Sequence, residues 1–161
     1  MPIYMNFNNL GIKGNVTAEG HQDWIELNSC QWGVGRGISS PTGASADRES
    51  SAPSVSEVVV TKQWEFSSPL LIQEALQGEG VVVVIHFTKT AQGKLENYIE
   101  FTLTNTMISG YSASSGGDAP SESLSLNFTK VEVKHVGSDI QGKAGGEPVV
   151  VNYDLALAKI V

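Results

Sequence analysis

The stretch SLSLNFTKVEVKH, residues 123–135, decides the fold because its apolar residues change parity halfway along. Leu124 and Leu126 occupy even positions, whereas Val131 and Val133 occupy odd ones. Successive side chains of a strand point to opposite faces, so a slip of one residue moves the apolar set to the other face. This change is typical of a strand that leaves one sheet and enters a second at a bulge or corner.

Two other stretches, residues 3–12 and 24–34, show the same slip between odd and even apolar positions. Residues 98–107 alternate without a slip, and residues 149–157 keep one apolar parity, as a last strand would. Three slips in one chain indicate long strands that contribute to two sheets. We therefore expect a closed or nearly closed two-sheet β-barrel.

The segment SSPLLIQEALQGEG, residues 67–80, is the one predicted helix. Ser68 is the expected N-cap, Pro69 suits the first turn, and Gly78 can end the helix. The stripe that it would bury is Leu71, Ala75, Ile72 and Leu76. The predicted fold is mainly β, a two-sheet β-barrel with one short flanking α-helix, in a single domain over residues 1–161.

Composition and charge exclude several classes of function. The 161 residues carry a net charge of −7, which argues against binding to nucleic acid or to an anionic membrane. The start of the chain lacks the basic and apolar regions of a signal peptide, and its longest aliphatic run is far too short to span a membrane. We expect a protein that is cytoplasmic when made, and that leaves the cell, if it does, without a signal peptide.

Two segments suggest contacts with other subunits. In VVVVIHF, residues 81–87, both parities are apolar, so Val82, Val84 and His86 are candidates for a subunit interface; a central strand of a sandwich explains the pattern equally well. The second segment, residues 33–54, is a long loop rich in Gly, Ser and Pro, which we interpret as an arm that orders against a partner, with disorder as the alternative. Its candidate contact residues are Val34, Arg36, Ile38, Asp47, Arg48 and Glu49.

No catalytic, metal or cofactor site is predicted. His21 and Asp23 would share a strand face, but a metal needs three or four ligands, and His86 and His135 belong to separate strands. Cys30, the only cysteine, excludes an intrachain disulfide and reads as a small core residue. The glycines at 33, 35 and 37 lack the spacing and the following helix of a phosphate loop.

Three tryptophans keep an alternative function open. Trp24, Trp32 and Trp64 could form a stacking platform for sugars, which would make the chain a monomeric β-sandwich that binds carbohydrate. Core packing is the competing explanation, because each tryptophan lies in or beside an amphipathic strand.

The order of several motifs resembles the haemolysin-coregulated protein family, the tube protein of bacterial type VI secretion systems. The motifs are IKG at 12–14, HQDWIELNSCQWGVGRG at 21–37, SSPLL at 67–71, GYSASSGGDAPSESLSLNFTKVEVKH at 110–135 and GKAGGEP at 142–148. The Gly-rich loop into the opening stretch, together with the paired-tryptophan strand, is the most specific part.

This resemblance implies a structural protein and not an enzyme. Its subunits would assemble into homo-hexameric rings that stack into a hollow tube, and the tube would carry a spike and small effector proteins. A contractile sheath would propel it into a target cell, and subunits would be secreted without a signal peptide. The resemblance also implies that the loop at residues 34–54 reaches to the next subunit or ring.

Overall fold

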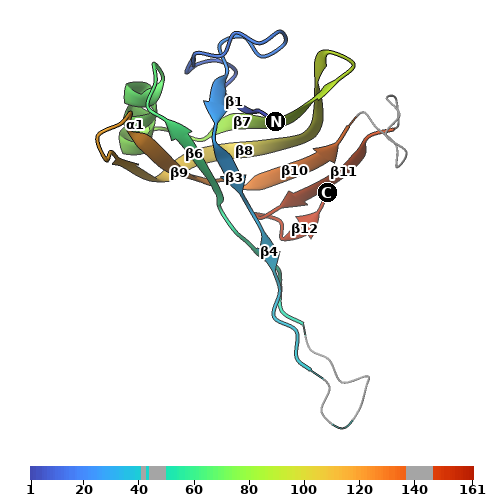
Figure 1. Ribbon diagram of the computed structural model, residues 1–161. Helices are drawn as coiled ribbons and strands as arrows, with labels where there is room; N and C mark the ends of the chain where they lie inside the picture. The colour runs from blue at the N-terminus through green and yellow to red at the C-terminus, as the bar shows by residue number, and fades with distance from the viewer. Residues whose placement is uncertain (41–42, 44–49, 137–146) are drawn as a thin grey trace.

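The computed structural model describes residues 1–40, 43, 50–136 and 147–161 (Figure 1). Its elements, in chain order, are β1 (Ile3–Phe7), β2 (Ile25–Leu27), β3 (Ser29–Gln31), β4 (Val34–Gly35), β5 (Ser54–Val55), β6 (Val58–Gln63), α1 (Ser68–Gln77), β7 (Val81–Ala91), β8 (Lys94–Ser114), β9 (Ser121–Asn127), β10 (Lys130–His135), β11 (Val149–Asp154) and β12 (Lys159–Ile160). The prediction of a mainly β fold with one short helix is confirmed.

Two antiparallel sheets are joined through the long strand β8. The first sheet has the order β12-β11-β10-β8-β7-β1-β2, and the second runs β3-β6-β9-β8. The sheets do not close into a complete barrel, because β2 and β3 are both end strands, separated in the chain by Asn28. The expected two-sheet architecture is therefore present in an open form.

The parity change in residues 123–135 marks a change of sheet, as predicted. β9 pairs with β6 and β8 in the second sheet, whereas β10 pairs with β8 and β11 in the first. Leu124, Leu126 and Val131 are all buried in the same core despite their opposite parities. The slip in residues 24–34 has the same origin, because β2 pairs with β1 and β3 pairs with β6.

The slip in residues 3–12 has a different cause, so that part of the prediction is wrong. Asn8, Asn9 and Leu10 have φ values of 55°, 50° and 66°, which place them in a left-handed turn. The chain folds back so that Ile12 bridges to Phe7. A turn, and not a second sheet, changes the parity here.

A further corner lies inside β8, where the alternation had predicted an uninterrupted strand. Asn105 has φ 54°, and the register with β7 shifts between the pairs Val81↔Thr106 and Val83↔Leu103. This bulge turns Thr106 into the core and leaves Met107 half exposed. Beyond it, β8 leaves β7 and pairs with β9.

The helix α1 starts one residue earlier than expected. Ser67 is the N-cap, without a side-chain capping hydrogen bond. The hydroxyl of Ser68 instead donates to the carboxylate of Glu122. Leu71 is fully buried in the core and Ala75 packs against it, as predicted. Leu76 is 81% exposed, so the expected second half of the stripe does not reach the core.

Candidate functional site: the arm, its apolar groove and two polar clusters

The loop at residues 33–54 begins as a two-stranded ribbon, which we call the arm (described residues 33–40 and 50–56). β4 pairs with β5, and a further bridge joins Ile38 to Ser50. Figure 1 shows the arm projecting far beyond the two sheets, and Val34 and Ile38 are exposed along it. Arg36 is also exposed, whereas Asp47, Arg48 and Glu49 lie outside the described residues.

Backbone hydrogen bonds hold the two sides of the arm together. Gly33 N–H donates to Ser56 Oγ at 2.9 Å and Gly37 N–H donates to Ser51 Oγ at 3.0 Å. Ser51 N–H in turn donates to the carbonyl of Gly37 at 2.8 Å. Two of the three glycines that could have suggested a phosphate loop, Gly33 and Gly37, therefore have their N–H groups engaged within the ribbon.

An apolar groove of about 250 Å³ lies where the arm meets the C-terminal strands. It is lined by Trp32, Val34, Pro53, Val55, Val131, Val133, Val151, Tyr153 and Ile160. Val151 is 55% exposed and Ile160 is 74% exposed, although both belong to the end of the first sheet. The predicted last strand is in fact a short hairpin, β11–β12. Apolar side chains of this hairpin, such as Val151 and Ile160, are not covered by any other part of the described chain.

The doubly apolar strand β7 is covered on its second face by the chain itself. Val84 packs with a small cluster formed by Tyr4, Val16 and Trp24, and the rings of His86 and Trp24 are 4.6 Å apart. Of the three proposed interface residues, Val82 is the one that stays exposed, at 44%.

The structure brings together two histidines that the sequence analysis had placed apart. His21 Nε2 lies 3.0 Å from His86 Nδ1, and His86 Nε2 lies 3.4 Å from Glu100 Oε1. Burial lowers the pKa of both imidazoles, and the Glu100 carboxylate partly opposes this shift. Among the described residues, the carboxylate of Asp23 forms no hydrogen bond or ion pair with either imidazole. No group of three or more metal-ligating residues occurs among the described residues.

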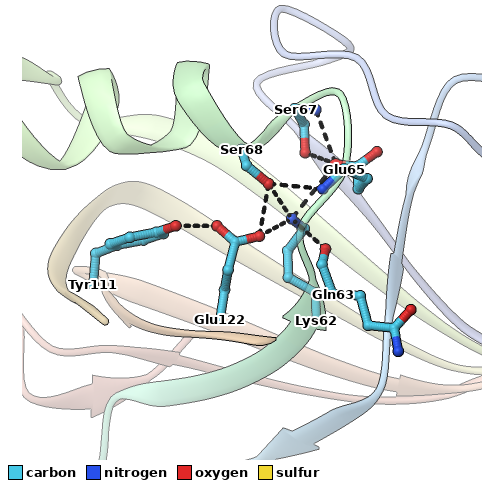
Figure 2. A network of polar contacts seen from close by, with 7 residues as sticks. All are labelled: Lys62, Gln63, Glu65, Ser67, Ser68, Tyr111 and Glu122. Carbon is cyan, nitrogen blue, oxygen red and sulfur yellow. Dashed lines mark hydrogen bonds and ion pairs between the residues drawn. The ribbon is translucent and has the colours of Figure 1, made fainter. Parts of the chain in front are cut away.

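A buried polar network lies under the start of α1 (Figure 2). Lys62 and Glu122 are both fully buried and form an ion pair with Nζ and Oε1 2.5 Å apart. Ser68 Oγ donates to Glu122 Oε1 at 2.7 Å and accepts from Lys62 Nζ at 3.1 Å, while the hydroxyl of Tyr111 donates to Glu122 Oε2. Burial would raise the pKa of Glu122, but these hydrogen bonds outweigh it and hold the pKa below its usual value.

The network contains a serine beside a lysine, yet its geometry does not suit a nucleophile. Ser68 is fully buried, and its proton is already donated to a carboxylate. Lys62 Nζ lies 2.5 Å from Glu122 Oε1 and 3.5 Å from Glu65 Oε1, so the lysine is already paired with two carboxylates. The network instead fixes the first turn of α1 onto β6 and β9.

The remaining candidate residues are dispersed. Trp24 is buried beside the histidines, Trp32 stacks edge-on against Phe101 at 5.7 Å, and Trp64 is 42% exposed next to α1. No ring contact joins any two of these tryptophans in the described part of the chain, so they form no common platform. Cys30 is half-buried, and burial raises the pKa of its thiol to about 11.

Within the described ranges, no helix has the length and apolar character needed to cross a membrane.

A search of curated proteins gives no match. The family model described as "Type VI secretion system effector, Hcp" matches residues 4–135.

Solved structures agree with that match. A protein described as "a type six secretion system protein" is 25% identical, with a TM-score of 0.87 over 99% of both chains. Hcp1 from Salmonella typhimurium is 20% identical, with a TM-score of 0.74 over 99% of this chain and 98% of that one. A type VI secretion system effector from Yersinia pestis is 18% identical, with a TM-score of 0.72 over 94% and 98%. The chain therefore belongs to the Hcp family of type VI secretion systems.

Proposed function

We propose that this chain is a structural tube subunit, in which six copies form a ring and rings stack into a hollow tube that carries effectors. The observation that carries the proposal is the arm, because a long ribbon that exposes Val34 and Ile38 away from any core has apolar surface to bury against another molecule. Family membership over most of the chain supports the same role.

The apolar groove and the β11–β12 hairpin form the proposed contact between neighbours in a ring. An exposed strand at the end of a sheet offers unpaired backbone groups and promotes pairing with another chain. In a closed ring each subunit offers one surface and receives another, so no edge is left open. Val82, exposed on β7, is a second candidate for this contact, whereas Val84 and His86 already have partners within the chain.

The proposed partners follow from this role. They are further copies of the chain, the spike and sheath proteins of the secretion machine, and small effector proteins held in the lumen. The subunit would be made in the cytoplasm and secreted as part of the tube. Neither nucleic acid nor a catalytic substrate enters the proposal.

The solution mass of the purified protein tests ring formation. Six subunits of 17.1 kDa give about 103 kDa by light scattering on a sizing column, with annular particles in negative stain. A species that stays at 17.1 kDa at high concentration would contradict self-assembly.

Two variants separate ring formation from stacking. Replacing residues 38–50 by Asn-Gly closes the ribbon between the hydrogen-bonded residues Gly37 and Ser51 with a two-residue turn. We expect this variant to form rings that do not stack, and Val151→Glu to remain a monomer because it places a charge in the apolar groove. Leu76→Glu, on the exposed side of α1, is the matched control and should assemble normally. Normal tubes from the shortened arm would refute the stacking role.

A further inference from the structure

The contact between His21 and His86 has a fixed order of donors and acceptors. The Glu100 carboxylate accepts, which assigns the proton of neutral His86 to Nε2 and leaves its Nδ1 as an acceptor. His21 therefore donates through Nε2 over the 3.0 Å contact. A single added proton on Nδ1 of His21 keeps this arrangement. If the two facing nitrogens, His21 Nε2 and His86 Nδ1, both carry a proton, two N–H groups point at each other and the hydrogen bond is lost.

This pair connects the N-terminal loop, residues 8–24, to the face of β7. Inside the loop, Val16 N–H donates to the carbonyl of Trp24 at 3.1 Å, and Trp24 N–H donates to that of His21. The Trp24 ring packs 4.7 Å from His21 and 4.6 Å from His86. His21 and Trp24 are thus the loop residues whose side chains contact β7 through ring packing and hydrogen bonding.

The charged groups around the pair can balance one positive charge. Glu100 on β8 is the only carboxylate in direct contact with either imidazole in the described structure. Tyr4 on β1 stacks against His21 at 4.9 Å as a neutral phenol, with Glu26 of β2 near it. The loop adds the carboxylates of Glu19 and Asp23, and Lys94, at the start of β8, lines a hollow together with Glu19.

We propose that the His21–His86 pair is an acid-sensitive clasp, which holds the N-terminal loop on β7 while one facing nitrogen is unprotonated and releases it when both carry protons. Because burial lowers both pKa values below the ordinary 6.5, the loop-closed form binds fewer protons than the open form. The closed state is therefore favoured above that pH and loses stability as the pH falls below it. The released loop uncovers Tyr4 on β1 and Val84 on β7, which form an apolar patch.

Amide hydrogen exchange by NMR tests the clasp, with protection factors corrected for the intrinsic pH dependence of exchange. Between pH 7.5 and 5.0, the amides of Val16 and Trp24 should lose protection against exchange. The loss should be about tenfold for each unit by which closing the loop lowers the pKa of the pair. The amide of Ile85, in the core of β7, should keep its protection. His86→Gln retains an acceptor that does not titrate and should reduce the loss to the share that His21 contributes, whereas His135→Gln, at the exposed third histidine, should leave the full loss intact.

Each other outcome overturns the clasp. A parallel loss at Ile85 would mean that acid destabilises the whole fold, and a loss as large in His86→Gln as in the unmodified protein would assign the effect to another group. If His86→Gln does not fold, the imidazole titrations of the unmodified protein decide: two independent transitions near 6.5 refute the clasp, and lowered, interacting transitions support it. The result does not depend on whether the chain forms a tube.

Discussion

The Lys62–Glu122 ion pair and the His21–His86 pair are two buried polar contacts that differ in how completely their atoms are hydrogen-bonded. Glu122 accepts hydrogen bonds on both oxygens, and Lys62 has four oxygen partners within 3.5 Å. In the second cluster, Nδ1 of His21 is buried without a hydrogen-bond partner of good geometry. Although burial opposes them, hydrogen bonds hold the pKa of Glu122 below its usual value, so this carboxylate stays charged across the neutral pH range, whereas the two histidines respond to added protons. The predictions below test this contrast.

The largest expected effect comes from Lys62→Met, which leaves the buried carboxylate of Glu122 without its counter-charge. We expect it to lower the free energy of unfolding by about 3–5 kcal/mol in urea denaturation. Lys62→Met/Glu122→Leu removes both charges and should recover most of this loss. Lys159→Met, at an exposed position, is the control and should change stability by no more than about 0.5 kcal/mol. Equal losses in the single and double variants would contradict the ion-pair explanation.

Tyr111→Phe should have a smaller effect, because it removes one hydrogen bond to Glu122 and leaves the ion pair in place. The expected loss in free energy of unfolding is about 1.5 kcal/mol. Tyr153→Phe is the matched control, since the hydroxyl of Tyr153 makes no hydrogen bond among the described residues. Similar losses in the two variants would show that Tyr111 acts through packing alone.

His86→Gln should cost about 1 kcal/mol or less at pH 7.5, because the histidine cluster is already incomplete and Gln can still accept from His21. The same urea experiment measures it. A loss as large as that of Lys62→Met would remove the distinction between the two clusters.

The pH dependence of the free energy of unfolding should distinguish the two clusters already in the unmodified protein. The pKa of Glu122 lies below its unfolded value of 4.5, so its contribution is complete above that value and is lost as the pH falls through the folded pKa. The histidine contribution is lost at higher pH, below 6.5. Unfolding curves should therefore show two separate acid limbs, of which His86→Gln flattens the upper one and Glu122→Gln the lower. A single limb would refute the separation.

The fold was predictable from sequence wherever apolar residues define both sides of a corner. Leu126 and Val131 report the change from β9 to β10 directly. The bulge at Asn105 is followed by two adjacent apolar residues of opposite parity, Met107 and Ile108, so the pattern alone did not show which of them is buried. Residues 8–10 gave a false signal because a left-handed turn and a change of sheet shift the parity in the same way.

The polar clusters were beyond the reach of sequence patterns. Lys62 occupies a core-facing position of β6, after Val58 and Val60, and a lysine in an alternating pattern normally indicates solvent. Its partner Glu122 is 60 residues away, and His21 is 65 residues from His86. Only the sheet topology brings such pairs together. The arm's contact residues were chosen from composition, and the ribbon that presents Val34 and Ile38 became visible only in three dimensions.

The long strand β8 has a consequence for how the molecule unfolds. Its first part pairs with β7 and β10, and its second part pairs with β9, so each sheet contains a portion of the same strand. Neither sheet can melt without freeing the backbone of the other, which makes the two sheets one cooperative unit. The arm shares no strand with them, because β4 and β5 pair only with each other, so the ribbon can open while both sheets stay intact.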